Sequence, residues 1–272
     1  MKALVLSGGA GFGAYQVGAW QALQETGWEP DVVVGASIGA VNGYAMSRGA
    51  GLSDLREIWL DLPAAIHSAQ GKRRLVPVWG EAALFRDWVY AVAREFAQRP
   101  VVRDLRITLT HLPSCGIHVA RGSEITEKHL LASCSLFGVL PPIFVNGGYY
   151  MDGGTFCRLP IRQALLPEVT EIVAVDVLAV PSSFVVRRLV RGAARTRNFL
   201  RRERPEPSDE ELSGVRLLRV GHARPLGTTR QCFQWDRQRW EELIGTGYRD
   251  TVSQIESSWL CEGGRSELVT AS

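Results

Sequence analysis

The stretch from Val32 to Val41 constrains the fold more than any other part of this 272-residue chain. A run of valines ends at Gly35, Ser37 stands between Gly35 and Gly39, and small residues open a segment with a helical pattern. This Gly-x-Ser-x-Gly pattern is typical of a sharp strand–turn–helix connection that holds a serine in a strained conformation. Side chains at the two flanking glycines would collide with the strand or the helix. The pattern predicts a nucleophilic Ser37 at a helix N-terminus, where free N–H groups favour negative charge.

Alternating strand and helix patterns on either side of this turn predict an α/β fold with a mainly parallel sheet. Strands are expected at 3–6, 31–35, 106–110, 116–120, 171–178 and 215–220. Helices are expected at 14–26, 38–48, 52–60, 80–98, 125–133, 184–200 and 235–259, and Gly245 and Gly247 could interrupt the last of them. Residues 136–146 contain prolines and are expected to be irregular. One domain over 1–272 is the simpler interpretation, with a motif-bearing core at about 1–180 and a basic helix and closing helices at about 181–272.

Composition excludes several classes of protein. Hydrophobic residues make up 46% and charged residues 22% of the chain, as in an ordinary globular protein, and the net charge of +3 is too small to indicate nucleic-acid binding. Five scattered cysteines without a Cys-x-x-Cys spacing favour a reducing compartment and no metal site. No apolar run has the length of a signal peptide or a membrane span. We therefore expect a soluble, cytoplasmic protein.

A glycine-rich loop follows the first expected strand and allows two interpretations. Residues 9–14 fit the relaxed dinucleotide-binding pattern G-x-G-x-x-G/A between a strand and a helix. That pattern also needs an acidic residue near the end of the second strand. Here the second strand ends in Gly35-Ala36-Ser37, and Asp31 lies at its other end. A nucleotide-binding domain therefore remains an alternative that lacks its supporting residue.

The second interpretation makes this loop an oxyanion hole and needs no cofactor. Backbone N–H groups of successive small residues can converge on one oxygen. The predicted donors are Gly9, Ala10 and Gly11, and Gly8 and Gly13 would support the turn. In a parallel sheet this loop and the serine turn leave the same carboxyl edge. We therefore expect the donors beside the nucleophile.

A serine nucleophile needs a base, and two candidates compete. Asp152 follows an apolar–aromatic segment and precedes Gly153, so its carboxylate projects from an uncrowded turn. Burial would raise its basicity. His222 could instead complete a Ser–Asp–His triad of the α/β-hydrolase type, although Ser37 lies unusually early in the chain for that fold. A further carboxylate, Asp176, lies within an expected strand, where a structural role is favoured.

Four separated motifs resemble the patatin-like phospholipase family in order and spacing. They are Ser7 to Gly18, Gly35 to Gly39, Ala132 to Ser135 ahead of two prolines, and Asp152 to Gly154. The likeness covers about residues 1–177. It implies a three-layer α/β/α fold and a Ser–Asp dyad without histidine that hydrolyses acyl esters of lipids through an acyl-enzyme. By this resemblance Ser37 is the nucleophile, Asp152 is the base and no cofactor takes part.

The glycine loop departs from the family pattern at two positions. Ala10 stands where the family usually has a third glycine, and Phe12 stands at a position that is usually basic. An alanine still offers its N–H, but a positive φ there would cost on the order of 1 kcal/mol. We expect an active enzyme that is slow or altered in its substrate preference.

A basic segment, Arg187 to Arg204, completes the set of candidate functional features. Its apolar residues fall at helical spacing, which predicts a basic amphipathic helix. Such a helix could rest on an anionic bilayer and place the enzyme peripherally at a membrane. It is equally an outer face neutralised by the acidic residues that follow. The arginines lack interleaved aromatic residues, so we expect no nucleic-acid partner.

Overall fold

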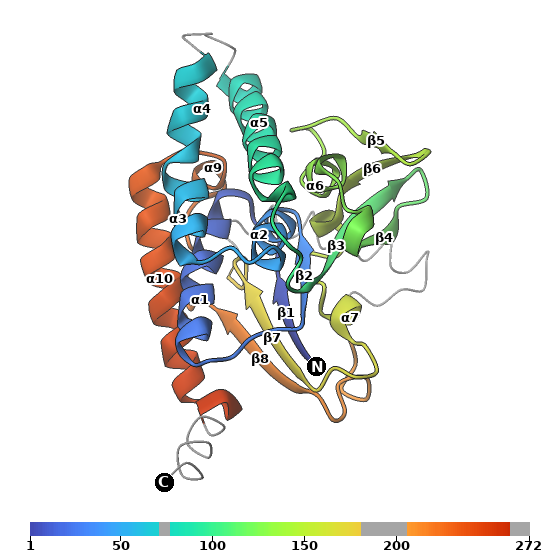
Figure 1. Cartoon of the computed structure of the whole chain (residues 1–272), viewed down its shortest axis with the longest axis vertical. Coiled ribbons are helices and arrows are strands. Elements are labelled where there is room, and N and C mark those ends of the chain that lie inside the picture. Colours follow the sequence, from blue (N-terminus) through green and yellow to red (C-terminus); the bar gives the residue numbers. More distant parts are fainter. Residues whose placement is uncertain (71–76, 181–205, 262–272) are drawn as a thin grey trace.

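The computed structural model describes residues 1–70, 77–180 and 206–261. Within them, eight strands form one mixed sheet in the order β5-β6-β3-β2-β1-β7-β8, with β4 paired to β3 (Figure 1). The strands are β1 (Lys2–Leu6), β2 (Val32–Ala36), β3 (Asp104–Leu112), β4 (Gly116–Arg121), β5 (Ile143–Val145), β6 (Gly148–Asp152), β7 (Glu171–Asp176) and β8 (Arg216–Gly221). Strands β3, β2, β1, β7 and β8 run parallel, whereas β4, β5 and β6 pair antiparallel.

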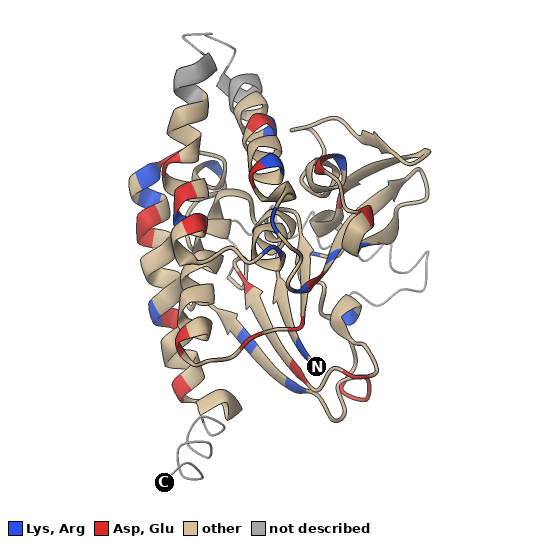
Figure 2. Cartoon of the chain, viewed as in Figure 1, with Lys and Arg blue, Asp and Glu red and all other residues tan. Residues whose placement is uncertain are grey.

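Helices lie on both faces of the sheet and give the α/β/α layering (Figure 1). The described helices are α1 (Ala14–Glu25), α2 (Ile38–Ser47), α3 (Leu52–Leu60), α4 (Leu62–Gln70), α5 (Pro77–Ala97), α6 (Glu127–Ser133), α7 (Ile161–Ala164), α9 (Thr229–Cys232) and α10 (Arg237–Glu256). The short helix α7 packs on one face, and α1, α2 and α10 cover the other. Charged residues gather on the outer helices, as Figure 2 shows for α3, α5 and α10.

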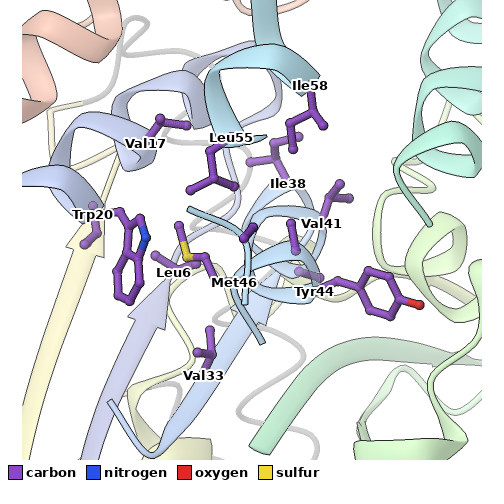
Figure 3. Packing of buried hydrophobic residues seen from close by; sticks show 14 of the residues in the cluster. Leu6, Val17, Trp20, Val33, Ile38, Val41, Tyr44, Met46, Leu55 and Ile58 are labelled. Carbon is purple, nitrogen blue, oxygen red and sulfur yellow. The ribbon is translucent and has the colours of Figure 1, made fainter. Parts of the chain in front are cut away.

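The central strands are apolar on both faces because each face is covered. In β1, Leu4 and Leu6 join the large core under α1 and α2, whereas Ala3 and Val5 join the smaller core under α7. This continuous apolar pattern is the one expected of parallel strands buried on two sides. Figure 3 shows side chains from β1, β2, α1, α2 and α3 converging in the larger core.

The predicted fold class is confirmed, and most predicted elements are present within a few residues of their expected limits. Helix α4 was not predicted, and β5 forms within the segment 136–146 that was expected to be irregular. The last predicted helix is present as α10, and neither Gly245 nor Gly247 interrupts it. Gly247 instead allows α10 to approach α1, because a Cβ there would lie 2.0 Å from the Tyr15 carbonyl oxygen. The helix expected at 184–200, with the basic segment 187–204, lies outside the described residues.

Candidate active site

Ser37 occupies the turn between β2 and α2 in a backbone conformation that few residues adopt. Its φ is 54° and its ψ is −124°, and its side chain is nearly buried at 8% exposure. The strained turn predicted from the sequence is therefore present. Such a conformation costs on the order of 1–3 kcal/mol and persists only where the surroundings enforce it.

The two glycines around Ser37 are required by close packing of the backbone. A Cβ at Gly35 would lie 2.4 Å from the carbonyl oxygen of Gly39. A Cβ at Gly39 would lie 2.4 Å from the carbonyl oxygen of Leu6. Any larger residue at either position would push α2 away from β1 and β2, and Ser37 would move with it.

A buried serine holds the turn from outside. The backbone N–H of Ser37 donates to Oγ of Ser133, which lies 3.0 Å away at the end of α6. The Ser133 hydroxyl in turn donates to the carbonyl oxygen of Thr108 on β3, at 2.9 Å. Ser133 is fully buried, so both hydrogen bonds are shielded from water. It therefore ties the elbow to the middle of the sheet.

Asp152 ends β6 and is almost fully buried, with 5% exposure. Its backbone N–H donates to the Ser135 carbonyl oxygen at 3.1 Å, and its Oδ1 accepts from the Gly154 N–H at 2.6 Å. The Thr155 N–H also bonds the carboxyl group. These contacts fix both the backbone and the side chain of Asp152.

The structure brings Ser37 and Asp152 together, although 115 positions separate them in the sequence. Strand β3 sets this proximity, because Thr108 is in register with Ala36 on one side and Leu109 with Asp152 on the other. The Ser37 hydroxyl lies close enough to the Asp152 carboxyl group to lower the pKa of that group. Burial raises the pKa of Asp152 to about 6, while Ser37 and the hydrogen bonds from two backbone N–H groups oppose that rise.

A thiol that the sequence analysis did not single out also contacts the serine. Cys134 is buried, and its thiol lies close enough to the Ser37 hydroxyl for that group to influence the pKa of the thiol. Burial, together with the nearby Asp152 carboxylate, raises the pKa of this thiol well above its usual value. Cys134 is therefore a neutral neighbour of Ser37 at physiological pH, and the thiolate that would compete as a nucleophile is suppressed.

The glycine loop lies beside this pair, as predicted for two turns at the same sheet edge. A Cβ at Gly8 would lie 3.1 Å from Cβ of Ser37. Ala10 has a φ of 45°, so the alanine adopts the left-handed conformation that favours glycine. Phe12 is buried in the core rather than facing the loop, at 2% exposure.

The predicted donors of this loop differ in what they contact. The Gly11 N–H points to the sulfur of Cys232, whose thiol donates to the Gly9 carbonyl oxygen at 3.1 Å. The Gly8 N–H donates to the carbonyl oxygen of Arg158 at 2.9 Å. Among the described residues, the N–H groups of Gly9 and Ala10 have no protein acceptor.

Buried amides support the loop from below, which the sequence analysis did not predict. The Asn42 amide donates to the Gly13 carbonyl oxygen at 3.0 Å and to the Gln16 side chain at 2.9 Å. Gln16 donates to the Ser7 carbonyl oxygen at 2.8 Å, and the Trp59 indole donates to Asn42 at 2.9 Å. Amides at the apolar faces of two predicted helices were the available signal, because buried polar groups usually have a specific partner.

His222 has partners other than Ser37. Its Nε2 lies 3.0 Å from the Val177 carbonyl oxygen, and its Nδ1 bonds the Arg224 carbonyl oxygen. Both ring nitrogens are thus engaged by backbone. Asp176 forms an ion pair with Arg158, in line with the structural role favoured for it.

Two negative findings apply to the described residues only. No group of three or more His, Cys, Asp or Glu side chains there has the arrangement of a metal site. In residues 1–70, 77–180 and 206–261, every helix is too short or too polar to cross a bilayer.

Comparison with known proteins finds one matching family model and several related enzymes. The model of the patatin-like phospholipase family matches residues 4–116. Lysophospholipase NTE1 of Yarrowia lipolytica is 28% identical over 192 residues, which is 64% of this chain and 12% of that protein. Lysophospholipase NTE1 of Candida albicans is 29% identical over 192 residues, with 64% and 13% covered. The chain therefore spans only a small part of the length of these curated relatives.

A solved structure shares the fold at lower sequence similarity. VipD from Legionella pneumophila aligns with a TM-score of 0.52 and 13% identity, over 94% of this chain and 67% of that one. At this identity the likeness concerns the fold alone.

Proposed function

We propose that the chain, whose residues 4–116 match the model of the patatin-like phospholipase family, is a serine acyl hydrolase that cleaves acyl esters of lipids. The observation that carries the proposal is the placement of Ser37, in its strained turn, beside the buried Asp152 carboxyl group, whose pKa the Ser37 hydroxyl lowers. The relatives named lysophospholipase support a phospholipid with an acyl ester as the substrate class.

In the proposed first step, Ser37 attacks the acyl carbonyl carbon while Asp152 takes the hydroxyl proton. A carboxyl group with a pKa of about 6 is a better base than one at its usual value, and this supports the role of Asp152. Collapse of the intermediate breaks the acyl C–O bond. The leaving alcohol takes the proton from Asp152, and the acyl group stays on Ser37.

We assign the N–H groups of Gly9 and Ala10 to the oxyanion of this intermediate. Gly8, which directly precedes them, lies beside Ser37, and their N–H groups have no backbone acceptor among the described residues; both observations support the assignment. The Gly11 N–H faces the Cys232 sulfur, so we give it the task of holding the loop. Preorganised donors of this kind are worth about 10²–10³-fold in rate each.

Water completes the proposed cycle. It attacks the acyl-Ser37 ester and gives its proton to Asp152, and the same two N–H groups again bind the oxyanion. The bond to Ser37 then breaks, the fatty acid leaves, and the proton on Asp152 returns to the serine oxygen. Asp152 carries one proton at a time, first from Ser37 to the leaving alcohol and then from water to Ser37, so the scheme needs no histidine.

Fluorophosphonate labelling and turnover of a p-nitrophenyl ester test this proposal in the wild type, Ser37→Ala and Asp152→Asn. We expect no labelling of Ser37→Ala and a loss of about 10³-fold or more in turnover for each variant. The double variant should be no slower than the worse single variant, because the two residues act as one unit. Undiminished turnover in Ser37→Ala would overturn the proposal.

His222→Gln serves as the matched control, and we expect its turnover to stay within about twofold of the wild type. Loss of activity in His222→Gln with retention in Asp152→Asn would favour the Ser–Asp–His alternative. Absence of labelling in the wild type, together with a thermal shift on adding NAD or ATP, would favour the nucleotide-binding alternative.

A further inference from the structure

The segment between α6 and Asp152 combines exposed aromatic side chains with a complete lack of charge. No Asp, Glu, Lys or Arg occurs between Lys128 and Asp152, although such residues make up 22% of the chain. Within this segment Phe137 is 83% exposed, Phe144 is 55% exposed and Tyr149 is 56% exposed. Large exposed apolar side chains gathered in one segment mark an interaction site more often than scattered ones do.

Two of these rings form one face of the β5–β6 hairpin. Phe144 is in register with Tyr149, and the ring centroids lie 5.1 Å apart. Tyr149 also lines an open hollow of about 300 Å³ with Leu112, Pro113 and Pro142. Phe144, Tyr149, Leu112, Pro113 and Pro142, together with the exposed Phe137 of the same uncharged segment, are called the aromatic surface below.

The strand next to this hairpin is uncharged as well. Leu112 on β3 is in register with Tyr149, and no Asp, Glu, Lys or Arg occurs between Arg106 and Arg121. Figure 2 shows β5 and the adjoining ends of β3 and β4 without charged residues, in contrast to the outer helices, and in β6 the last residue, Asp152, is the charged one. The aromatic surface is therefore set in a wider region that can leave water without desolvating a charge.

Both ends of this segment are anchored at the candidate active site. At one end Ser133 binds the Ser37 N–H, and at the other end lies Asp152 itself. A hydrogen bond of 3.1 Å from the Asp152 N–H to the Ser135 carbonyl oxygen joins the two ends. Tyr149 lies three positions before Asp152 on β6, about 10 Å along the strand. Whatever binds the aromatic surface is thus held next to Ser37 and Asp152.

We propose that the aromatic surface docks the protein on a lipid surface, by inserting uncharged aromatic side chains among the head groups of zwitterionic lipids. Phenylalanine supplies buried apolar area there, and tyrosine places its ring in the apolar layer and its hydroxyl in water. This inference rests on the proposed function, because a lipid substrate is what makes a bilayer the natural occupant of a surface beside Ser37. A protein partner would be expected to meet a rim of charged side chains, which this region lacks.

Binding to vesicles of pure phosphatidylcholine tests the inference, because these vesicles have no net charge to attract a basic segment. The test variant is Phe137→Ser combined with Phe144→Ser and Tyr149→Ser. We expect its partition into vesicles to fall by about tenfold or more. The matched control is Val101→Ser with Val102→Ser, which removes two exposed apolar side chains (60% and 54%) from elsewhere and should bind as the wild type does.

Two further variants keep the test decisive. Phe137→Ser alone changes a loop residue and covers the case in which the triple variant fails to fold. Replacing all three residues by Trp should restore binding, since tryptophan also favours the membrane interface. Equal binding of the wild type and folded Ser variants to phosphatidylcholine vesicles would overturn the inference. So would a wild-type dimer in solution that Phe137→Ser dissociates, because the occupant would then be a second copy.

Activity measurements separate this inference from the proposed function. Turnover of a soluble p-nitrophenyl ester should be unchanged in the triple Ser variant, while hydrolysis of vesicle phospholipid falls with binding. Ser37→Ala should bind vesicles as the wild type does. Vesicle binding that depends on the aromatic surface in a protein without esterase activity would contradict the proposed function and leave the docking surface standing.

Discussion

The segment that carries Ser37 and the segment that carries Asp152 differ in how their positions are set. Ser37 is placed by its immediate neighbours: β2 ends, two glycines allow a tight turn, and Ile38 anchors α2 in the core. Asp152 is placed by distant parts of the chain. Strand β6 must pair with β3, and β3 must pair with β2, before the carboxyl group reaches the serine.

This difference explains why the position of Ser37 is easier to predict from the sequence than that of Asp152. A local turn leaves a local pattern, and Gly35-Ala36-Ser37-Ile38-Gly39 carries nearly all of it. The environment of Asp152 depends on antiparallel pairing, in which a slip of one residue would turn the carboxyl group to the other face of the sheet. Ser133 links the local turn to the strand pairing, since it binds the Ser37 N–H and the carbonyl group of Thr108 on β3.

The comparison is tested most strongly at Ser133. Ser133→Ala removes the acceptor of the Ser37 N–H and leaves that group buried without a partner. We expect turnover to fall by about 5–150-fold, which corresponds to the roughly 1–3 kcal/mol of an unsatisfied buried group. The fall should appear in kcat and in the rate of fluorophosphonate labelling, because the lost contact orients the nucleophile rather than the substrate.

Ser135→Ala is the matched control, since its hydroxyl donates only to the Leu131 carbonyl oxygen within the end of α6. Its turnover should be within about threefold of the wild type. Ser133→Thr retains the hydroxyl and should recover part of the loss. Normal labelling of Ser133→Ala would mean that the turn is held by its own residues. The position of Ser37 would then depend on local residues alone, in contrast to that of Asp152.

Features set by neighbouring residues could be predicted from the sequence, and features set by distant parts of the chain could not. The parallel core, the elbow and the loop were predictable because each rests on a short pattern beside a buried strand. Asp152 was a candidate base because of its turn, but its pairing with Ser37 in a dyad without histidine was inferred from a resemblance to a family. Ser133, Cys134 and Cys232 could not be assigned contacts, because their partners lie on elements that only the folded sheet brings near. The buried Asn42 and Gln16 were visible as polar residues in apolar helices, but their partners were not.

The raised pKa of Asp152 gives the second test, through pH. A base must be ionised, so kcat/KM should fall about tenfold per unit as the pH drops below the pKa of about 6. The rate of fluorophosphonate labelling should follow the same profile, and it reports Ser37 without product release. A labelling rate that is flat from pH 7 to about pH 4.5 would contradict the role of Asp152 as base.

The contribution of Asp152 to stability should fall as the pH rises, whereas kcat/KM should rise with pH. The pKa of Asp152 is higher in the folded chain than its ordinary value of 3.8, so folding favours the protonated carboxyl group. Its contribution to stability is complete below that ordinary value and is lost as the pH rises through about 6. The difference in unfolding free energy between the wild type and Asp152→Asn should therefore vary over this range and be constant above it.

The glycine loop gives the smallest expected effect and extends the comparison to a third position. Ala10 holds a φ of 45°, which costs a residue with a Cβ about 1 kcal/mol that glycine does not incur. Ala10→Gly should raise the unfolding free energy by up to about 1 kcal/mol, measured by urea denaturation, and should not lower the labelling rate because the N–H is retained. Ala19→Gly, in the middle of α1, should change stability with the opposite sign, by about 1 kcal/mol or more. If both substitutions destabilise the chain alike, contacts around Ala10 compensate for the strain of its positive φ. Ala10 would then be held in place by distant parts of the chain, as Asp152 is, and not by its immediate neighbours, as Ser37 is.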